Sequence, residues 1–447
     1  MAEATILRFP SDFLWGTATS AHQVEGGNHN NDWWAWEQTP GHIHDGSTSD
    51  PACDWWHRAE EDFDRAQAMG QNAHRLSVEW SRIEPREGEW SGEAIARYRQ
   101  MLTALRERGI EPMVTLHHFT NPLWLVEKRG WETEAVIPLF ARYVEKVVQE
   151  LGDLVSLWCT INEPIVVPFN GYVLGSFPPG KGGLRLGLRV LGHLLKAHAA
   201  AYGLIHRLQP EAQVGVAHNM RPVDPAHPQS VLDRWAAGLR DRMGNRLVER
   251  ALTEGVLDFF PFARTERVPE LAGAFDYFGL NYYNRDRVVF DLRQPSQLFT
   301  RALPAPHDQP VPWWWGEIYP EGLYRLLKEL ARHGKPILIT ENGALDNTDA
   351  YRPRYLLTHL VAVHRAISEG VPVRGYFHWS LVDNFEWAEG YSARFGLIHV
   401  DFETQRRTMK RSGKLYAEIC QAGGITAEMV ERYAPEVKES VLPSQAG

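Results

Sequence analysis

Residues 156–164 read Ser-Leu-Trp-Cys-Thr-Ile-Asn-Glu-Pro, a short apolar run that ends in an amide, a carboxylate and a proline. The apolar part has the length and composition of a buried strand. Pro164 cannot donate a hydrogen bond to a strand ladder, so we expect the strand to stop there. Asn162 and Glu163 therefore belong at the carboxyl end of a strand.

Seven further runs of this kind are spread along the chain. The eight candidate strands are residues 13–24, 72–80, 111–119, 156–164, 212–220, 275–283, 336–343 and 373–381. Amphipathic helical patterns separate most of them, at residues 59–69, 94–108, 136–151, 187–207, 320–332 and 352–369. Alternating strands and helices indicate parallel βαβ units, and eight units predict an α/β fold of the (β/α)8 TIM-barrel type.

The sequence shows no linker between these units. The longest irregular stretch, residues 288–315, is rich in proline and polar residues, and we expect a functional loop within the sixth unit. After Gly424 we expect only a short helical tail. The interpretation is therefore one domain over residues 1–447, a barrel with extended βα loops.

Composition excludes several classes of partner. The formal charge of −9 comes from interspersed acidic and basic residues, so no basic stripe favours nucleic acid. Residues 1–10 lack the apolar run of a secretion signal, and we expect a cytoplasmic protein without a membrane partner. Cys53, Cys159 and Cys420 are too few and too far apart for a disulfide framework or a thiolate metal site. We expect no metal and no cofactor, and the oligomeric state stays open.

The candidate strands close on polar or aromatic residues that are unusual at strand ends. These are Gln23, Arg75, His118, Asn162 with Glu163, Asn219, Asn281 with Tyr283, Glu341, and Trp379. Any one of them alone is explained by a hydrogen bond to a loop. A barrel, however, collects its active site at the carboxyl ends of its strands, so the whole set predicts an active site there.

Two carboxylates in this set suggest the chemistry. Glu341 lies before a glycine turn at the end of the seventh run, three strands around the barrel from Glu163. Breaking a glycosidic bond needs a proton for the leaving oxygen and a negative group beneath the anomeric carbon. We expect Arg75 and Tyr283 to favour the charged form of Glu341, whose charge then favours a neutral Glu163.

The motifs together resemble glycoside hydrolase family 1. They are Thr160–Pro164, Thr340–Gly343, the run Phe-Leu-Trp-Gly-Thr-Ala-Thr-Ser-Ala at 13–21, Arg-Phe-Gly-Leu at 394–397 and Lys-Arg-Ser at 410–412. The resemblance implies a retaining β-glycosidase, chiefly a β-glucosidase, with Glu163 as general acid/base and Glu341 as nucleophile. Its partners are then small β-glycosides or oligosaccharides, with transfer to acceptors other than water as a side reaction.

The same resemblance implies the sugar-binding residues. Gln23, His118, Glu386 and Trp387 then hold the 3-, 4- and 6-hydroxyls, Asn162 holds the 2-hydroxyl, and Trp379 lies beneath the ring; Asn281 and Phe395 complete the sugar site, and Trp315 faces the leaving group. Trp315 belongs to the unusual run Trp-Trp-Trp-Gly-Glu at 313–317, which leaves the preference for the leaving group open.

Two alternatives compete with this hypothesis. A carboxylate at Glu386 would repel a phosphate dianion, which disfavours a 6-phospho-β-glycosidase. Relatives that lack one catalytic carboxylate act as binding proteins, whereas both glutamates are present here. A catalytically silent carbohydrate-binding protein stays the alternative, since motifs do not show spacing in three dimensions, and a turnover assay separates the two.

Overall fold

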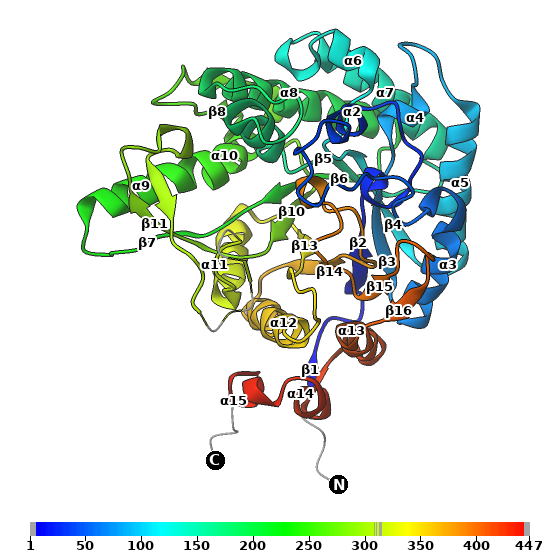
Figure 1. Cartoon of the computed structure of the whole chain (residues 1–447), viewed down its shortest axis with the longest axis vertical. Coiled ribbons are helices and arrows are strands. Elements are labelled where there is room, and N and C mark those ends of the chain that lie inside the picture. Colours follow the sequence, from blue (N-terminus) through cyan, green and yellow to red (C-terminus); the bar gives the residue numbers. More distant parts are fainter. Residues whose placement is uncertain (1–5, 308, 310, 313–314, 442–447) are drawn as a thin grey trace.

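The computed structural model describes residues 6–307, 309, 311–312 and 315–441. Eight parallel strands form a closed barrel at its centre (Figure 1). They are β2 (Leu14–Ala18), β3 (Ala73–Ser77), β4 (Glu111–His117), β5 (Leu157–Asn162), β6 (Gln213–Asn219), β10 (Tyr277–Tyr282), β13 (Ile337–Asn342) and β14 (Val373–Trp379). Each strand pairs with its neighbour in this order, and β14 closes the barrel against β2. The predicted (β/α)8 fold is confirmed.

Helices cover the outside of the barrel (Figure 1). They include α3 (Trp55–Ala68), α5 (Gly92–Glu107), α7 (Val136–Leu151), α8 (Leu184–Leu208), α11 (Pro320–Leu330), α12 (Arg352–Ser368) and α13 (Arg411–Ala422). In α7 the buried residues Phe140, Val144, Val147 and Leu151 recur at helical spacing, which gives one apolar stripe toward the barrel. Between β6 and β10 the chain adds α9 (Val231–Asp241) and α10 (Leu247–Glu254).

The first predicted strand was too long. β2 ends at Ala18, and residues Ala21–Val24 form the short helix α1. Ser20 is the last extended residue, and the backbone N–H of Glu25 donates to the Ala21 carbonyl to close a helical turn. Gln23 therefore reaches the barrel mouth from a helix and not from a strand end. Arg75 likewise lies in the middle of β3 and not at its end.

Two further expectations are corrected. Residues 288–315 are not wholly irregular, because β11 (Asp286–Phe290) pairs with β12 (Thr300–Ala302) and with β7 (Val223–Pro225) in a small sheet. Strands this short left no clear alternation in the sequence. The C-terminal tail is not purely helical either, since β17 (Gly424–Thr426) pairs with β1 (Ile6–Arg8) before α14 (Ala427–Tyr433). Trp313 and Trp314 lie outside the described residues.

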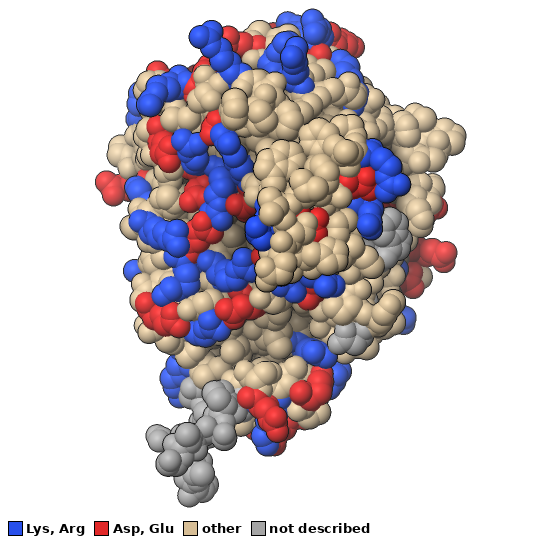
Figure 2. Space-filling view, turned by 90° about the vertical axis from the view of Figure 1, so that its left-hand side faces the viewer, with Lys and Arg blue, Asp and Glu red and all other residues tan. Residues whose placement is uncertain are grey.

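Charges of both signs lie side by side on the face shown in Figure 2. Many charged residues of the protein form ion pairs, such as Arg432 with Glu418 at 2.9 Å and Arg365 with Glu321 at 2.8 Å. No helix in the described part of the chain combines the length and the apolar character that crossing a membrane requires.

Candidate active site

The strand ladder is irregular at the carboxyl ends of three barrel strands. The pairing of β5 with β6 shifts between Cys159 and Asn162, and that of β10 with β13 shifts between Leu280 and Asn281. A third shift, between β13 and β14, also precedes Asn342. Such bulges re-aim side chains next to active sites. Here they precede or flank the residues around Glu163 and Glu341.

Gly343 ends β13 with a close approach to β14. A β-carbon at this position would lie only 2.0 Å from the carbonyl oxygen of Trp379. Only glycine therefore fits at the turn that follows Asn342 while Trp379 stays at the mouth.

Glu163 follows β5 in an uncommon backbone conformation. Its φ is +46°, in the left-handed region that L-residues other than glycine seldom adopt. Its backbone N–H donates to the Ala217 carbonyl of β6 at 2.7 Å, which ties the turn to the barrel. The side chain is buried. Its Oε1 accepts hydrogen bonds from Asn281 Nδ2 at 2.8 Å and Asn219 Nδ2 at 3.0 Å.

Both of these hydrogen bonds go to Oε1, so the other carboxyl oxygen of Glu163, Oε2, is available to a substrate. No described residue is hydrogen-bonded to Oε2. Desolvation, together with the negative charge of Glu341, raises the pKa of Glu163 to about 7. The side chain can therefore hold a proton on Oε2 near neutral pH and release it to a substrate atom.

Glu341, unlike Glu163, has a hydrogen-bond donor on each of its carboxyl oxygens. Its Oε1 accepts from Arg75 Nη1 at 2.5 Å and its Oε2 from the Tyr283 hydroxyl at 2.5 Å. Arg75 is buried completely and is oriented by Thr115 Oγ1 at 3.0 Å and by Asn162 Oδ1 at 2.6 Å. A buried guanidinium and a phenol both favour the ionised carboxylate. Both carboxyl oxygens of Glu341 therefore receive a hydrogen bond from the protein.

Asn281 connects the surroundings of the two carboxylates. Its Nδ2 contacts Asn162 Oδ1 at 3.2 Å as well as Glu163, and its Oδ1 accepts from Thr340 Oγ1 at 2.7 Å. Thr340 immediately precedes Glu341 on β13. The amide is therefore fixed from both ends, and it links the two sides of the mouth rigidly.

The imidazole of His118 is prepared to donate a hydrogen bond. Because Arg75 and Asn281 both donate to Asn162 Oδ1, the Nδ2 of Asn162 must face His118 Nε2, 3.0 Å away. Burial, with the charge of Arg75, lowers the pKa of His118 well below its usual value, so the ring is neutral. The proton then sits on Nδ1, which is buried and has no partner in the described part of the chain. A substrate hydroxyl would supply one.

Gln23 on α1 and Glu386 in the loop after β14 form a second pair of polar side chains across the barrel mouth. Gln23 Nε2 donates to the Phe385 carbonyl at 2.8 Å and contacts Glu386 Oε2 at 3.3 Å, and its Oε1 accepts from Ser20 Oγ at 2.7 Å. Desolvation, together with the charges of Glu341 and Glu163, raises the pKa of Glu386 to about 8. A largely neutral Glu386 can both donate to and accept from a sugar hydroxyl.

Aromatic side chains complete the mouth. His118 stacks with Trp379 and with Trp387, each at 6.0 Å between ring centroids. Phe395 packs against Trp315 at 5.2 Å and Tyr283 at 6.2 Å. Flat apolar faces beside hydroxyl-binding groups suit a pyranose ring. All thirteen residues predicted for the site are thus linked to one another by hydrogen bonds or ring contacts.

Two residues near the site were assigned no role from the sequence, although Asn219 belongs to the set of polar residues at strand ends. Asn219, at the end of β6, bonds directly to Glu163, and its position at a strand end was the available signal. His22 stacks on Trp387 at 5.8 Å and bonds to the buried Glu37 at 2.7 Å, so it supports that ring from behind. Nothing in the sequence joins His22 to Glu37, because only the fold brings α1 and α2 (Asp32–Glu37) together.

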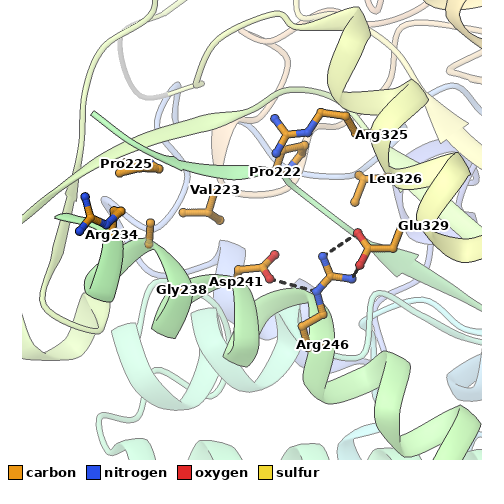
Figure 3. Close-up of a pocket in the computed structure, with 11 residues that line it drawn as sticks. Pro222, Val223, Pro225, Arg234, Gly238, Asp241, Arg246, Arg325, Leu326 and Glu329 are labelled. Carbon is orange, nitrogen blue, oxygen red and sulfur yellow. Dashed lines mark hydrogen bonds and ion pairs between the residues drawn. The ribbon is translucent and has the colours of Figure 1, made fainter. Parts of the chain in front are cut away.

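A separate cavity of about 360 Å³ lies between α9 and α11 (Figure 3). Its charged residues are paired with one another or with near neighbours. Arg246 binds Asp241 at 3.0 Å and Glu329 at 2.6 Å, and Arg325 binds Asp224 at 3.0 Å. It shares no residue with the network around Glu163 and Glu341, so it is not part of the candidate active site.

Comparison with known proteins agrees with this geometry. The model of glycosyl hydrolase family 1 matches residues 6–425. β-Glucosidase A of Thermotoga maritima is 34% identical over 94% of this chain and 99% of its own length. The β-glucosidase of an Agrobacterium species is 35% identical over 92% of this chain and 95% of its own.

Solved structures show the same likeness. A β-glycosidase from Pyrococcus horikoshii superposes with a TM-score of 0.88 at 38% identity, covering 96% of this chain and 98% of its own. The T. maritima β-glucosidase in complex with glucoimidazole gives 0.88 at 34% identity, over 94% of this chain and all of its own. With the match over nearly the whole chain and the two carboxylates at the barrel mouth, this protein belongs to glycosyl hydrolase family 1.

Proposed function

We propose that this protein hydrolyses terminal, non-reducing β-linked glucosides with retention of anomeric configuration. The observation that carries the proposal is the contrast between two carboxyl groups at one barrel mouth. Glu341 receives a donor on each oxygen, whereas Glu163 has a pKa raised to about 7 and one oxygen unbonded by any described residue. A carboxyl group whose pKa is raised, beside a second carboxyl group that accepts a donor on each oxygen, fits an acid and a nucleophile.

In the first step, the proton on Glu163 Oε2 passes to the glycosidic oxygen while Glu341 attacks the anomeric carbon from the opposite face. The bond to the leaving group breaks, and a covalent glycosyl-enzyme forms on Glu341. In the second step, Glu163, now ionised, takes a proton from water, which attacks the anomeric carbon and releases Glu341. A sugar hydroxyl in place of water gives transglycosylation.

Glucose as the preferred sugar is supported by the polar groups described above and by the relatives, several of which are named β-glucosidases. Others of similar identity are named β-galactosidases, so the 4-hydroxyl is the position where tolerance is expected. We propose Gln23, His118, Asn162, Glu386 and Trp387 as the hydroxyl-binding residues.

The test is the configuration of the first product. Hydrolysis of an aryl β-glucoside, followed by proton NMR within the first minutes, should show β-glucose before mutarotation produces the α-anomer. Early α-glucose would overturn the retaining mechanism, and absence of any turnover would favour a sugar-binding role instead.

A further inference from the structure

Glu37, the last residue of α2, is a buried carboxyl group with two separate hydrogen-bond donors. Its Oε1 accepts from His22 Nε2 of α1 at 2.7 Å, and its Oε2 accepts from the backbone N–H of Ser49 at 2.8 Å. No Lys or Arg in the described part of the chain forms an ion pair with it. Burying a carboxyl group without such a cation is costly to the fold. Both donors lead to the 386–391 segment, which carries two of the proposed hydroxyl-binding residues.

Hydrogen bonds around α1 and α2 fix the tautomer of His22. Asn31 Oδ1 accepts from the backbone N–H of Trp34 at 2.9 Å, so Asn31 Nδ2 is the atom that faces His22 Nδ1, 3.3 Å away. An amide nitrogen of this kind can only donate, which makes His22 Nδ1 the acceptor. The ring proton is then on Nε2 and points to Glu37. The imidazole is therefore held at both of its nitrogens.

The imidazole held in this way stacks on Trp387. The two ring planes are 12° apart, with 5.8 Å between their centroids, and Trp33 of α2 contacts the same indole at 4.6 Å. Trp387 has a φ of +48°, in the left-handed region that residues with a β-carbon seldom adopt. Such a conformation persists only where the surrounding structure holds it. His22 and Trp33 are among the neighbours that hold this indole in place.

The second donor to the buried carboxyl group, Ser49, ends a loop that is bonded to the same segment. In this loop the backbone N–H of His44 donates to the Ala388 carbonyl at 2.7 Å. Asp45 Oδ2 accepts from the backbone N–H of Tyr391, also at 2.7 Å. The loop is thus bonded to the 386–391 segment at two points, and Ser49 fixes it to α2.

From these contacts we infer that Glu37 and His22 are positioning residues, which set the selectivity for the sugar hydroxyls bound by the 386–391 segment. Glu37 acts on the indole of this segment through His22, and on its backbone through Ser49 and the loop. Among the described residues, no hydrogen bond joins either of them to the two carboxyl groups of the proposed mechanism. The inference rests on the proposed function, because it takes Glu386 and Trp387 to be hydroxyl-binding residues.

Deoxy substrates measure this selectivity. For each variant, kcat/KM for an aryl β-glucoside is divided by kcat/KM for its 2-, 3-, 4- or 6-deoxy analogue. His22→Ala should lower the ratio at one or more of the 3-, 4- and 6-positions by ~2–10-fold, the usual value of one hydrogen bond. The ratio at the 2-position, which Asn162 is proposed to bind, should stay within twofold. Four unchanged ratios, or an equal fall in all four, would overturn the inference.

Two further variants make the comparison specific. Glu37→Gln should lower the same ratios, because glutamine has one acceptor oxygen and cannot accept from both His22 and Ser49. It also serves if His22→Ala does not fold. His29 is the matched control, since it likewise bonds to an aspartate at 2.8 Å and packs against a tryptophan at 4.1 Å between ring centroids. His29→Ala should leave every ratio within twofold, and a fall equal to that of His22→Ala would contradict the assignment.

A double-mutant cycle with Trp387→Phe separates positioning from a general loss of stability. If His22 acts through the indole, His22→Ala should lower kcat/KM no more than twofold when Trp387→Phe is already present. Independent effects would multiply instead. Multiplied losses would show that His22 does not act through Trp387.

Non-hydrolysable analogues separate this inference from the proposed function. Calorimetry with methyl 1-thio-β-glucoside and its deoxy analogues should show the same changes in affinity ratio for His22→Ala, whether or not any glucoside is hydrolysed. Absence of turnover in the wild-type protein, together with these changed affinity ratios, would reject the hydrolytic mechanism alone. Unchanged affinity ratios in an active enzyme would reject the positioning role alone.

Discussion

The hydroxyl of Tyr283 donates a hydrogen bond of 2.5 Å to Oε2 of Glu341. The preceding residue, Tyr282, lies on the same strand end but faces away from the barrel interior, and its hydroxyl donates to the Tyr319 carbonyl at 2.5 Å. The two adjacent tyrosines thus donate to different groups: Tyr283 to the carboxylate of Glu341 and Tyr282 to a loop carbonyl. This arrangement offers a matched pair of substitutions.

Tyr283→Phe should lower kcat/KM for aryl glucosides by ~10–100-fold, because a hydrogen bond to a charged group contributes about 1.5–3 kcal/mol. Tyr282→Phe should leave kcat/KM within severalfold, although its melting temperature can fall. Steady-state kinetics on both variants, with circular dichroism for folding, make the comparison. Equal losses in the two variants would show that Tyr283 acts only on the fold.

The roles of the two glutamates predict opposite stereochemistry in chemical rescue. Glu341→Ala should be nearly inactive on every substrate. Glu163→Ala should still react with a dinitrophenyl glucoside, because that leaving group needs no proton, and azide should then accelerate turnover. The azide product should be the β-anomer for Glu163→Ala and the α-anomer for Glu341→Ala, as read by NMR. The reverse pattern would exchange the two roles.

The pH dependence of the first step should follow Glu163. Its pKa is raised to about 7, so the acid form is present below pH 7 and is lost above it. For an alkyl glucoside, kcat/KM should therefore fall about tenfold per pH unit well above pH 7. For the dinitrophenyl glucoside this alkaline limb should be much shallower, because no proton is transferred. Identical limbs for both substrates would assign the titration to another group, such as Glu386.

Glu386 is predicted to bind hydroxyls and not to take part in bond breaking. Glu386→Ser should reduce kcat/KM for glucosides by ~2–10-fold, because a hydrogen bond between neutral groups contributes about 0.5–1.5 kcal/mol. Glu386→Gln should retain more activity, because desolvation already favours the neutral acid at pH 7 and glutamine has a similar shape. Neither variant should act on 6-phosphoglucosides, which also need a cation in the site. Unchanged kinetics in the serine variant would remove Glu386 from the site.

The barrel could be predicted because each of its strands is an apolar run with a polar end. Glu163 and Glu341 were located in this way, since Pro164 and Gly343 mark where their strands stop. The bulges beside Asn162 and Asn281 left no mark in the sequence, because they arise from pairing between strands distant along the chain.

Other features could not be predicted for similar reasons. Gln23 was assigned to the candidate strand of residues 13–24, whereas β2 ends at Ala18 and Ala21–Val24 form the short helix α1. The contact of Asn219 with Glu163 depends on side-chain direction at the end of β6, which alternation alone does not give.

The left-handed backbone at Glu163 positions a catalytic side chain but lowers the stability of the fold. A β-carbon at φ +46° costs the native state about 1 kcal/mol relative to glycine, and the buried carboxyl adds a desolvation penalty. Glycine at this position would relieve both and would abolish proton transfer. Replacement of Glu163 by glycine would therefore relieve strain in the fold while it removes the activity. A single substitution would then turn this enzyme into a protein that binds sugars without hydrolysing them.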